Sequence, residues 1–112
     1  MKAFITGISG FAGSHLAEFL IKKRYEVFGT FLNKNTFSNL TGFINKIKVY
    51  RCDIINYDAL KNVIKKVKPD EIYHLAAISF VPNSLTNPKL TFDTNLYGTL
   101  NLYQVIIDLN RP

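Results

Sequence analysis

The sequence predicts an α/β fold with a doubly wound parallel sheet, and three observations carry this prediction. Short apolar runs alternate with segments of helical period along the 112 residues, which is typical of βα units. A glycine-rich turn joins the first apolar run to the first helical segment. Right-handed crossovers between four parallel strands then give the strand order 3-2-1-4. We expect residues 1–112 to form one such domain, incomplete because the pattern stops before a fifth strand.

The first half of the chain holds three of the expected strands. The apolar run after Met1 is short and is expected to be buried on both faces of the sheet. The next segment has apolar residues at helical spacing, whereas the stretch after the second strand is polar and rich in asparagine. We expect strands at residues 2–6, 26–31 and 48–52, helices at 11–23 and, as a weak helix, 40–45, and a loop over 32–41.

The third expected helix covers residues 57–68. Asn56 precedes it and is a suitable N-cap, because its side chain can accept a hydrogen bond from a free amide of the first turn. Pro69 follows it and cannot continue a helix. A fourth strand is expected at residues 71–76.

The last expected helix covers residues 89–109. Asn87 as its N-cap and Pro88 as its first helical residue form a favourable helix start. The helix has two apolar stripes, so we expect one to pack on the sheet and the other on a second helix or a partner subunit. The stripes are Leu96, Leu100, Tyr103 and Ile107, and Leu102, Val105, Ile106 and Leu109.

Composition excludes several classes of protein. Apolar residues make up 47% of the chain, which is too many for a disordered segment. Cys52 is the one cysteine, so no intramolecular disulfide is possible. No apolar run is long enough for a signal peptide or a membrane span, so we expect a cytoplasmic protein. The net charge of +6 is spread over several helix faces without an aromatic–basic motif, which argues against nucleic-acid binding.

The strongest functional signal is the spacing G-x-x-G-x-x-G at Gly7, Gly10 and Gly13. It lies between a strand and a helix, which is the context that a dinucleotide-binding turn requires. Gly7 would allow a sharp turn, Gly10 would leave room for a pyrophosphate, and Gly13 would let the helix approach the sheet. The alternative is a βα turn with incidental glycines. We therefore expect a nicotinamide dinucleotide at this turn.

The end of the second strand bears on the choice between NADP and NAD. An acidic residue there would bind a ribose 2′-hydroxyl, as in NAD sites. This chain has Leu32, Asn33 and Lys34 there instead. Lys34 could pair with a 2′-phosphate or could simply be a solvated loop lysine. The charge argument favours NADP, with NAD as the alternative.

Three further residues stand at expected strand ends or inside the last helix. Asp53 could accept a hydrogen bond from an adenine amino group or could instead favour the start of the next helix. His74 is flanked by Tyr73 and Leu75, and we expect a packed histidine rather than a catalytic one. Asn95 lies in a helix, where asparagine has poor propensity, so it could be a buried hydrogen-bonding residue.

Taken together, these segments resemble the extended short-chain dehydrogenase/reductase superfamily, which includes nucleotide-sugar epimerases and dehydratases. Within it, residues 14–20 and 77–81 resemble the GDP-mannose 4,6-dehydratases and the GDP-4-keto-6-deoxymannose reductases. The resemblance implies a Rossmann-type fold, a nucleotide-sugar substrate and a homodimer or higher homo-oligomer. The segments that carry the superfamily resemblance are residues 6–16, 53–54, 73–77 and 95–102.

The resemblance also implies roles for individual residues. Asp53 and Ile54 would hold adenine, Asn95 would be a structural asparagine of the active site, and Ser79 and Phe80 would face the sugar nucleotide. No metal site is implied. The residues that would contact the cofactor are Gly7, Ser9, Gly10, Phe11, Ala12, Gly13, Asn33, Lys34, Asp53, Ile54, Leu75, Ala76 and Ala77.

The chain departs from the family pattern in two ways. GDP-mannose dehydratases usually have Gln-Asp in place of Phe11-Ala12 and two arginines in place of Leu32-Asn33. The catalytic Tyr-x-x-x-Lys pair of the family is expected beyond these residues, since the one match, Tyr57 with Lys61, falls on a helix away from the glycine turn.

We therefore expect the cofactor-binding N-terminal part of a nucleotide-sugar dehydratase, which uses NADP(H) for hydride transfer at the sugar C4. The alternatives are a GDP-4-keto-6-deoxymannose reductase or another epimerase and, in a different class, a non-catalytic NAD(P)-binding module.

Overall fold

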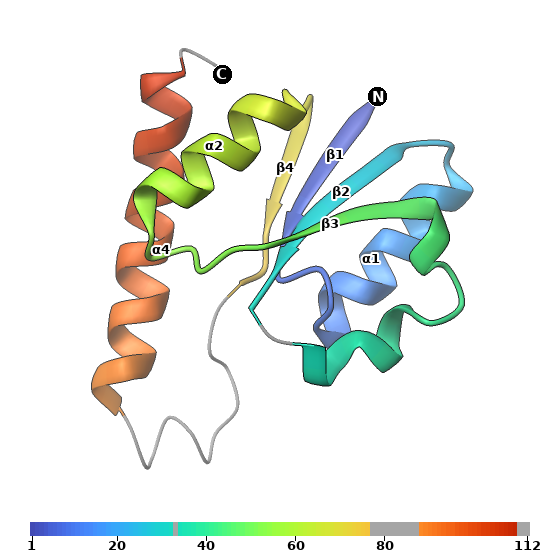
Figure 1. Cartoon of the computed structure of the whole chain (residues 1–112), viewed down its shortest axis with the longest axis horizontal. Helices are drawn as coiled ribbons and strands as arrows, with labels where there is room; N and C mark the ends of the chain where they lie inside the picture. The colour runs from blue at the N-terminus through green and yellow to red at the C-terminus, as the bar shows by residue number, and fades with distance from the viewer. Residues whose placement is uncertain (33, 77–87, 110–112) are drawn as a thin grey trace.

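The computed structural model describes residues 1–32, 34–76 and 88–109, with side chains except at 34–36 and 88–96. It contains a four-stranded parallel sheet in the order β3-β2-β1-β4, which confirms the predicted order. The elements, labelled in Figure 1, are β1 (Lys2–Thr6), α1 (Phe11–Lys22), β2 (Glu26–Phe31), η1 (Lys34–Leu40), η2 (Ile44–Lys46), β3 (Ile47–Arg51), α2 (Tyr57–Val67), β4 (Glu71–His74) and α4 (Pro88–Asp108).

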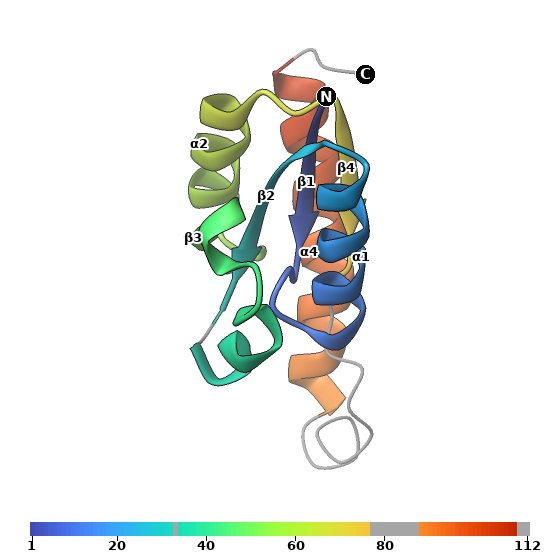
Figure 2. The same ribbon diagram turned by 90° about the vertical axis from the view of Figure 1, so that its right-hand side faces the viewer.

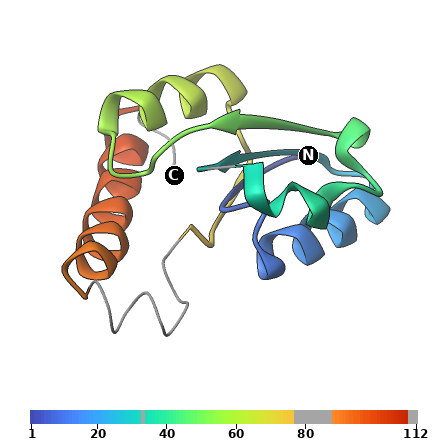
Figure 3. The ribbon, with the colours of Figure 1, turned by 60° about the horizontal axis from the view of Figure 1, so that its bottom comes forward.

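Helices cover the two faces of the sheet differently. Figures 2 and 3 show α1 on one face and α2 on the other, with α4 lying beside α2. Successive residues of β1 alternate between these faces, because side chains of a strand point to opposite sides. Ala3 and Ile5 join the buried cluster under α1, whereas Phe4 joins the cluster under α2 and α4. All three side chains are fully buried, so β1 is the central support of both clusters.

The polar segment after β2 is more ordered than expected. The predicted loop over residues 32–41 contains the 3₁₀ helix η1, and the predicted helix over 40–45 is wrong. Leu40 is fully buried, and the Phe37 ring stacks edge-on against Phe31 with centroids 4.7 Å apart. The amide of Phe43 then donates to the carbonyl of Leu40 over 3.0 Å, which makes a turn before η2. Phe37 and Leu40 stand among polar residues and do not form a helical period of apolar residues. The hydrophobic pattern therefore did not predict η1.

Other element ends differ by one or two residues from the expected ones. β3 begins at Ile47 and ends at Arg51, and α1 ends at Lys22. β4 ends at His74 rather than at residue 76. The reason at β4 is that the amide of Ala76 donates to the Thr6 hydroxyl over 3.0 Å instead of continuing a strand ladder. Shifts of this size are usual at element ends.

The predicted ends of α2 are confirmed in outline. The Asn56 side chain accepts a hydrogen bond of 3.1 Å from the amide of Ala59, so Asn56 is the N-cap. Lys68 ends the helix in a left-handed conformation with φ 55°, and Pro69 follows it. None of the helices within the described residues combines the length and the apolar character needed to cross a membrane.

Candidate dinucleotide-binding site

The turn between β1 and α1 accepts only glycine at two positions. Gly7 has φ +72°, a conformation that side chains disfavour, and a Cβ there would lie 2.9 Å from the backbone N and Cα of Ala76. A Cβ at Gly13 would lie 2.2 Å from the carbonyl oxygen of Gly7. The first glycine therefore brings β1 against the end of β4, and the last brings α1 against the turn.

Gly10 has a different environment from the other two glycines. A Cβ there would meet one neighbour within 4 Å, the Gly7 carbonyl oxygen at 3.4 Å, so the turn is open at this point. Gly10 is the N-cap of α1, and no side chain caps the helix start. The first helical bond runs from the Ser14 amide to the Gly10 carbonyl over 2.9 Å. The amides of Phe11 and Ala12 precede it, and such amides at a helix start suit an anionic group. The turn therefore fits a pyrophosphate.

The side chains next to the glycines differ in exposure. The Phe11 side chain is 78% exposed and stacks edge-on with His15, with ring centroids 4.5 Å apart. Ala12 is also exposed, whereas Ser9 is buried. The Ser9 carbonyl accepts a hydrogen bond of 2.9 Å from Nδ2 of Asn39 in η1. This bond ties the glycine turn to the segment after β2, and the sequence pattern gave no sign of Asn39.

A hydrogen-bond network joins β1, β4 and α4 beside the turn. The buried Thr6 hydroxyl oxygen accepts from the amides of Leu75 and Ala76 over 2.9 and 3.0 Å. It lies 2.7 Å from Nδ1 of His74, and Nε2 of His74 lies 3.0 Å from the Thr99 hydroxyl. Because the Thr6 oxygen already accepts two bonds, its own proton goes to Nδ1, which assigns the neutral ring with a proton on Nε2.

Burial lowers the pKa of His74 from its ordinary value of 6.5, in agreement with a neutral ring. Both ring nitrogens have partners, so His74 is the packed histidine that the sequence predicts rather than a free base. Sequence reasoning missed Thr6 and Thr99, because a threonine in a strand or a helix has no distinctive signal until its partner is known.

Asp53 and Ile54 lie where β3 leads into α2. Oδ1 of Asp53 accepts a hydrogen bond of 3.2 Å from the amide of Ile55, and its carbonyl accepts one of 2.9 Å from Asn56. Ile54 is buried, and its carbonyl accepts from Nδ2 of Asn101 over 3.1 Å. These bonds support the helix-start interpretation of Asp53, and an adenine contact by this residue stays a prediction.

Gly98 of α4 packs directly on Ile54. A Cβ at Gly98 would lie 2.3 Å from Cδ1 of Ile54, so the glycine allows α4 to approach Ile54 closely. The two residues that follow β4 lie on the other side of the turn, where Leu75 is 40% exposed and Ala76 is half-buried.

Several predicted residues lie outside the described part of the chain. Asn33, Ala77, Ser79 and Phe80 are among them, and for Lys34 and Asn95 only the backbone is described. Their expected contacts stay predictions. Within the described residues, no group of three or more metal-ligating side chains gathers in one place.

The Tyr57–Lys61 spacing has a structural explanation. The Tyr57 hydroxyl donates to a carboxylate oxygen of Asp108, and this bond raises the pKa of Tyr57 to about 12. Nζ of Lys61 lies 5.7 Å from the Tyr57 ring centroid. A catalytic tyrosine needs a lowered pKa, so Tyr57 links α2 to α4 rather than acting as an acid or base.

Comparison with known proteins gives a consistent result. A family model described as GDP-mannose 4,6 dehydratase matches residues 4–112. The chain is 39% identical over 98% of its length to a GDP-6-deoxy-D-talose 4-dehydrogenase of Aggregatibacter actinomycetemcomitans, covering 32% of that protein. It is 36% identical over 94% of its length to a GDP-mannose 4,6-dehydratase of Vibrio cholerae, covering 31% of that protein. The chain thus spans about a third of the length of these relatives.

Solved structures share the fold. The UDP-glucose 4-epimerase of Thermotoga maritima, solved with UDP-glucose, superposes with a TM-score of 0.88 at 27% identity, over 99% of this chain and 35% of that one. The Thermus thermophilus UDP-glucose 4-epimerase, solved with NAD, gives a TM-score of 0.82 at 28% identity, over 95% of this chain and 33% of that one. With its glycine turn, its Rossmann-type strand order and the match over residues 4–112, the chain belongs to the GDP-mannose 4,6-dehydratase family.

Proposed function

We propose that this chain binds NADP(H) and is the cofactor-binding part of a nucleotide-sugar dehydratase that resembles GDP-mannose 4,6-dehydratase. The observation that carries the proposal is the glycine turn. Gly7 and Gly13 hold the backbone in a conformation closed to side chains, whereas Gly10 leaves the uncapped start of α1 open. Backbone amides at such a helix start bind phosphate groups.

Each residue group at the carboxyl edge of the sheet has a proposed role. The amides of Phe11 and Ala12 would bind the pyrophosphate, Asp53 and Ile54 would line the adenine, and Ala76 would lie along the ribose. A bound nicotinamide would supply hydride transfer at C4 of the sugar. Proton transfer would come from residues outside these 112, because Tyr57, the one tyrosine with a lysine four residues later, is bonded to Asp108.

The proposal of NADP rests on charge at the end of β2. Leu32 and Asn33 stand where an NAD site would carry a carboxylate, and a carboxylate there would repel a 2′-phosphate. Titration calorimetry with NADP⁺ and with NAD⁺ tests this point. We expect both to bind and NADP⁺ to bind more tightly. The reverse order would favour NAD, the ligand named for the Thermus thermophilus relative.

A second candidate is a reductase or dehydrogenase acting on a GDP-6-deoxy sugar. The observation in its favour is the 39% identity to the GDP-6-deoxy-D-talose 4-dehydrogenase. The two candidates differ in what they do with GDP-mannose. When the whole protein is incubated with GDP-mannose and NADP⁺, a dehydratase forms a 4-keto-6-deoxy product that NMR detects, whereas a dehydrogenase leaves GDP-mannose unchanged. A non-catalytic module would bind the cofactor and convert neither this sugar nor a 6-deoxy sugar.

We also propose self-association through α4. One of its two predicted stripes packs into the core: Leu102 and Val105 are less than 5% exposed, and Ile106 and Leu109 are half-buried against them. In the other stripe, Leu100, Tyr103 and Ile107 are each more than half exposed. Removing these side chains from water would stabilise a homodimer or higher oligomer. Sedimentation should show a smaller species for the Leu100→Lys, Ile107→Lys double variant than for the parent chain. Equal sizes at the same concentration would contradict this role.

A further inference from the structure

Arg51 stands at the same edge as the glycine turn, although the cofactor motif does not include it. It is the last residue of β3, and its Cα is paired with that of Phe31, the last residue of β2. The next amide, that of Cys52, donates to the Phe31 carbonyl over 3.0 Å. Arg51 is therefore held beside the point where the chain leaves β2.

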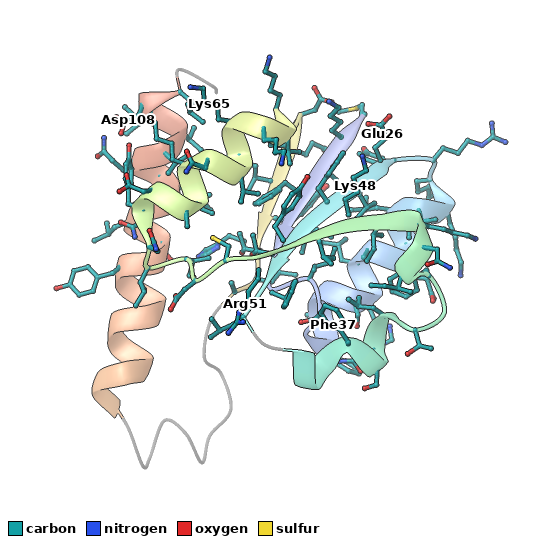
Figure 4. All side chains as sticks on the ribbon, viewed as in Figure 1. Glu26, Phe37, Lys48, Arg51, Lys65 and Asp108 are labelled. Atoms are coloured by element: carbon teal, nitrogen blue, oxygen red, sulfur yellow. The ribbon has the colours of Figure 1, made fainter. Side chains whose placement is uncertain are left out.

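The side of the sheet on which Arg51 lies follows from its neighbours. Tyr50 and Cys52 both pack into the cluster under α2 and α4, whereas Val49 packs into the cluster under α1. Because strand residues alternate, Arg51 points to the α1 side. Figure 4 shows its side chain directed from the end of β3 toward the end of β2.

The segment η1 borders the corner of the sheet where β2 and β3 end. It follows β2, and its Phe37 ring contacts Phe31, the register partner of Arg51. Arg51, the end of β3, thus lies beside the end of β2, where the adenosine ribose of a bound dinucleotide would lie.

The charge of Arg51 is available to a ligand. Its side chain is exposed, and the one ion pair among the described residues joins Lys22 to Glu18 at the other end of α1. The sequence places no carboxylate between residues 31 and 34. An anion at this corner would therefore meet a guanidinium that no described carboxylate neutralises.

We propose that Arg51 recognises the 2′-phosphate of NADP(H) and so sets the preference for NADP over NAD; this inference rests on the proposed cofactor binding. A guanidinium presents a planar pair of N–H donors that matches two phosphate oxygens. NAD carries a hydroxyl in place of this phosphate, so Arg51 would add little to its binding. Arg51 would supply this contact from β3, because the positions directly after β2 carry Leu32 and Asn33.

Titration calorimetry of three variants with NADP⁺ and NAD⁺ tests the inference. Since a hydrogen bond to a charged group contributes roughly ten- to hundredfold in affinity, Arg51→Ala should weaken NADP⁺ binding by about that factor and leave NAD⁺ binding within about twofold. Arg51→Lys should fall between parent and alanine, because it keeps the charge and loses the paired donors. Lys48→Ala is the matched control: it removes one positive charge from an exposed position of the same strand, on the opposite face of the sheet.

The outcomes separate this inference from the proposal on which it rests. If the parent binds NADP⁺ more tightly than NAD⁺ and Arg51→Ala keeps the same ratio, Arg51 is not the discriminating residue. If the parent binds neither nucleotide, the proposed function is wrong, and so is this inference. Equal losses of NADP⁺ affinity in Arg51→Ala and Lys48→Ala would show a general effect of charge and would also overturn the specific role of Arg51. Salt should reduce the difference between NADP⁺ and NAD⁺ in the parent more than in Arg51→Ala.

Discussion

The helices α1 and α4 lie against opposite faces of the sheet, and each depends on a glycine for its close approach. At α1 the atom that a Cβ of Gly13 would strike is a backbone atom, the Gly7 carbonyl oxygen. At α4 the atom that a Cβ of Gly98 would strike is the far end of a side chain, Cδ1 of Ile54. Backbone in a tight turn cannot move away, whereas a side chain can change its rotamer. The position of α1 is therefore fixed by the main chain, and that of α4 by side chains.

The difference between the two helices bears on the proposed cofactor site. The glycine turn is the proposed phosphate site, so a shift of α1 would move the amides that bind the cofactor. By contrast, α4 is held by the bonds of Thr99 to His74 and of Asn101 to Ile54, and by the bond between Tyr57 and Asp108.

The largest expected effect is that of Gly13→Ala. Its Cβ would lie 2.2 Å from the Gly7 carbonyl oxygen, so the turn or the helix must move. Overpacking of this kind should destabilise the chain by about 2–3 kcal/mol. Denaturant unfolding measures this change, and NADP⁺ titration should show weaker binding in the same variant. Gly42→Ala is the control, because nothing lies within 4 Å of its added Cβ. Equal effects of the two substitutions would contradict the close contact at Gly13.

Next in size is the expected effect of Thr6→Val. The variant keeps the shape of a fully buried side chain but removes the oxygen that accepts from Leu75 and Ala76. The Leu75 amide keeps its second acceptor, the Thr6 carbonyl, whereas the Ala76 amide loses its bond to the hydroxyl. A polar group left without a partner costs about 1–3 kcal/mol when buried, so unfolding should occur at lower denaturant concentration. Thr6→Ser keeps the hydroxyl and should lose less stability than the valine variant. A valine variant as stable as the parent would show that the network contributes nothing to stability.

A smaller loss is expected for Gly98→Ala. Alanine improves helix propensity by about 1 kcal/mol, which offsets part of the clash with Ile54. We expect a net loss of about 1 kcal/mol or less, well below that of Gly13→Ala. Ile54→Val removes the Cδ1 atom at 2.3 Å and keeps the Cγ1 atom at 2.7 Å, so it should relieve part of the cost of Gly98→Ala. A loss at Gly98 as large as that at Gly13, and not relieved by Ile54→Val, would abolish the distinction between the two helices.

The smallest expected effect is a pH dependence from His74. Its folded-state pKa is lowered by burial from 6.5, so the unfolded chain takes up a proton at a higher pH than the folded chain. The contribution of His74 to stability is therefore fully present above the pKa of the unfolded chain. It falls as the pH drops through that pKa, until the ring in the folded chain is also protonated. Unfolding measured at about pH 7.5 and about pH 5.5 should show this loss, and His74→Gln should reduce it. An unchanged pH dependence in His74→Gln would mean that other groups cause it.

The sequence predicted much of this structure because several of its signals act locally. Gly7 and Gly13 are required by a turn that three glycines define, and the Asn56 cap and Pro69 mark the ends of α2 within a few residues. The strand order followed from the handedness of crossovers, which is the same for nearly all parallel sheets. Such rules depend on neighbours along the chain or on chirality, so they can be applied before the fold is known.

The site was less predictable than the fold. Asn39 reaches Ser9 across 30 positions, and the network of Thr6 with His74 spans 68. A side chain that works through a partner so far away has no spacing that marks it. Arg51 likewise gains its meaning from its register with Phe31, which the pairing of β2 with β3 creates.

By itself, then, the sequence determined the α/β class, the strand order and the glycine turn, because these depend on local conformation and on the fixed hand of the chain. The tertiary structure alone decided which polar side chains meet at the carboxyl edge. Those contacts join segments far apart in sequence, and their geometry exists once β1, β3, β4 and α4 are packed together.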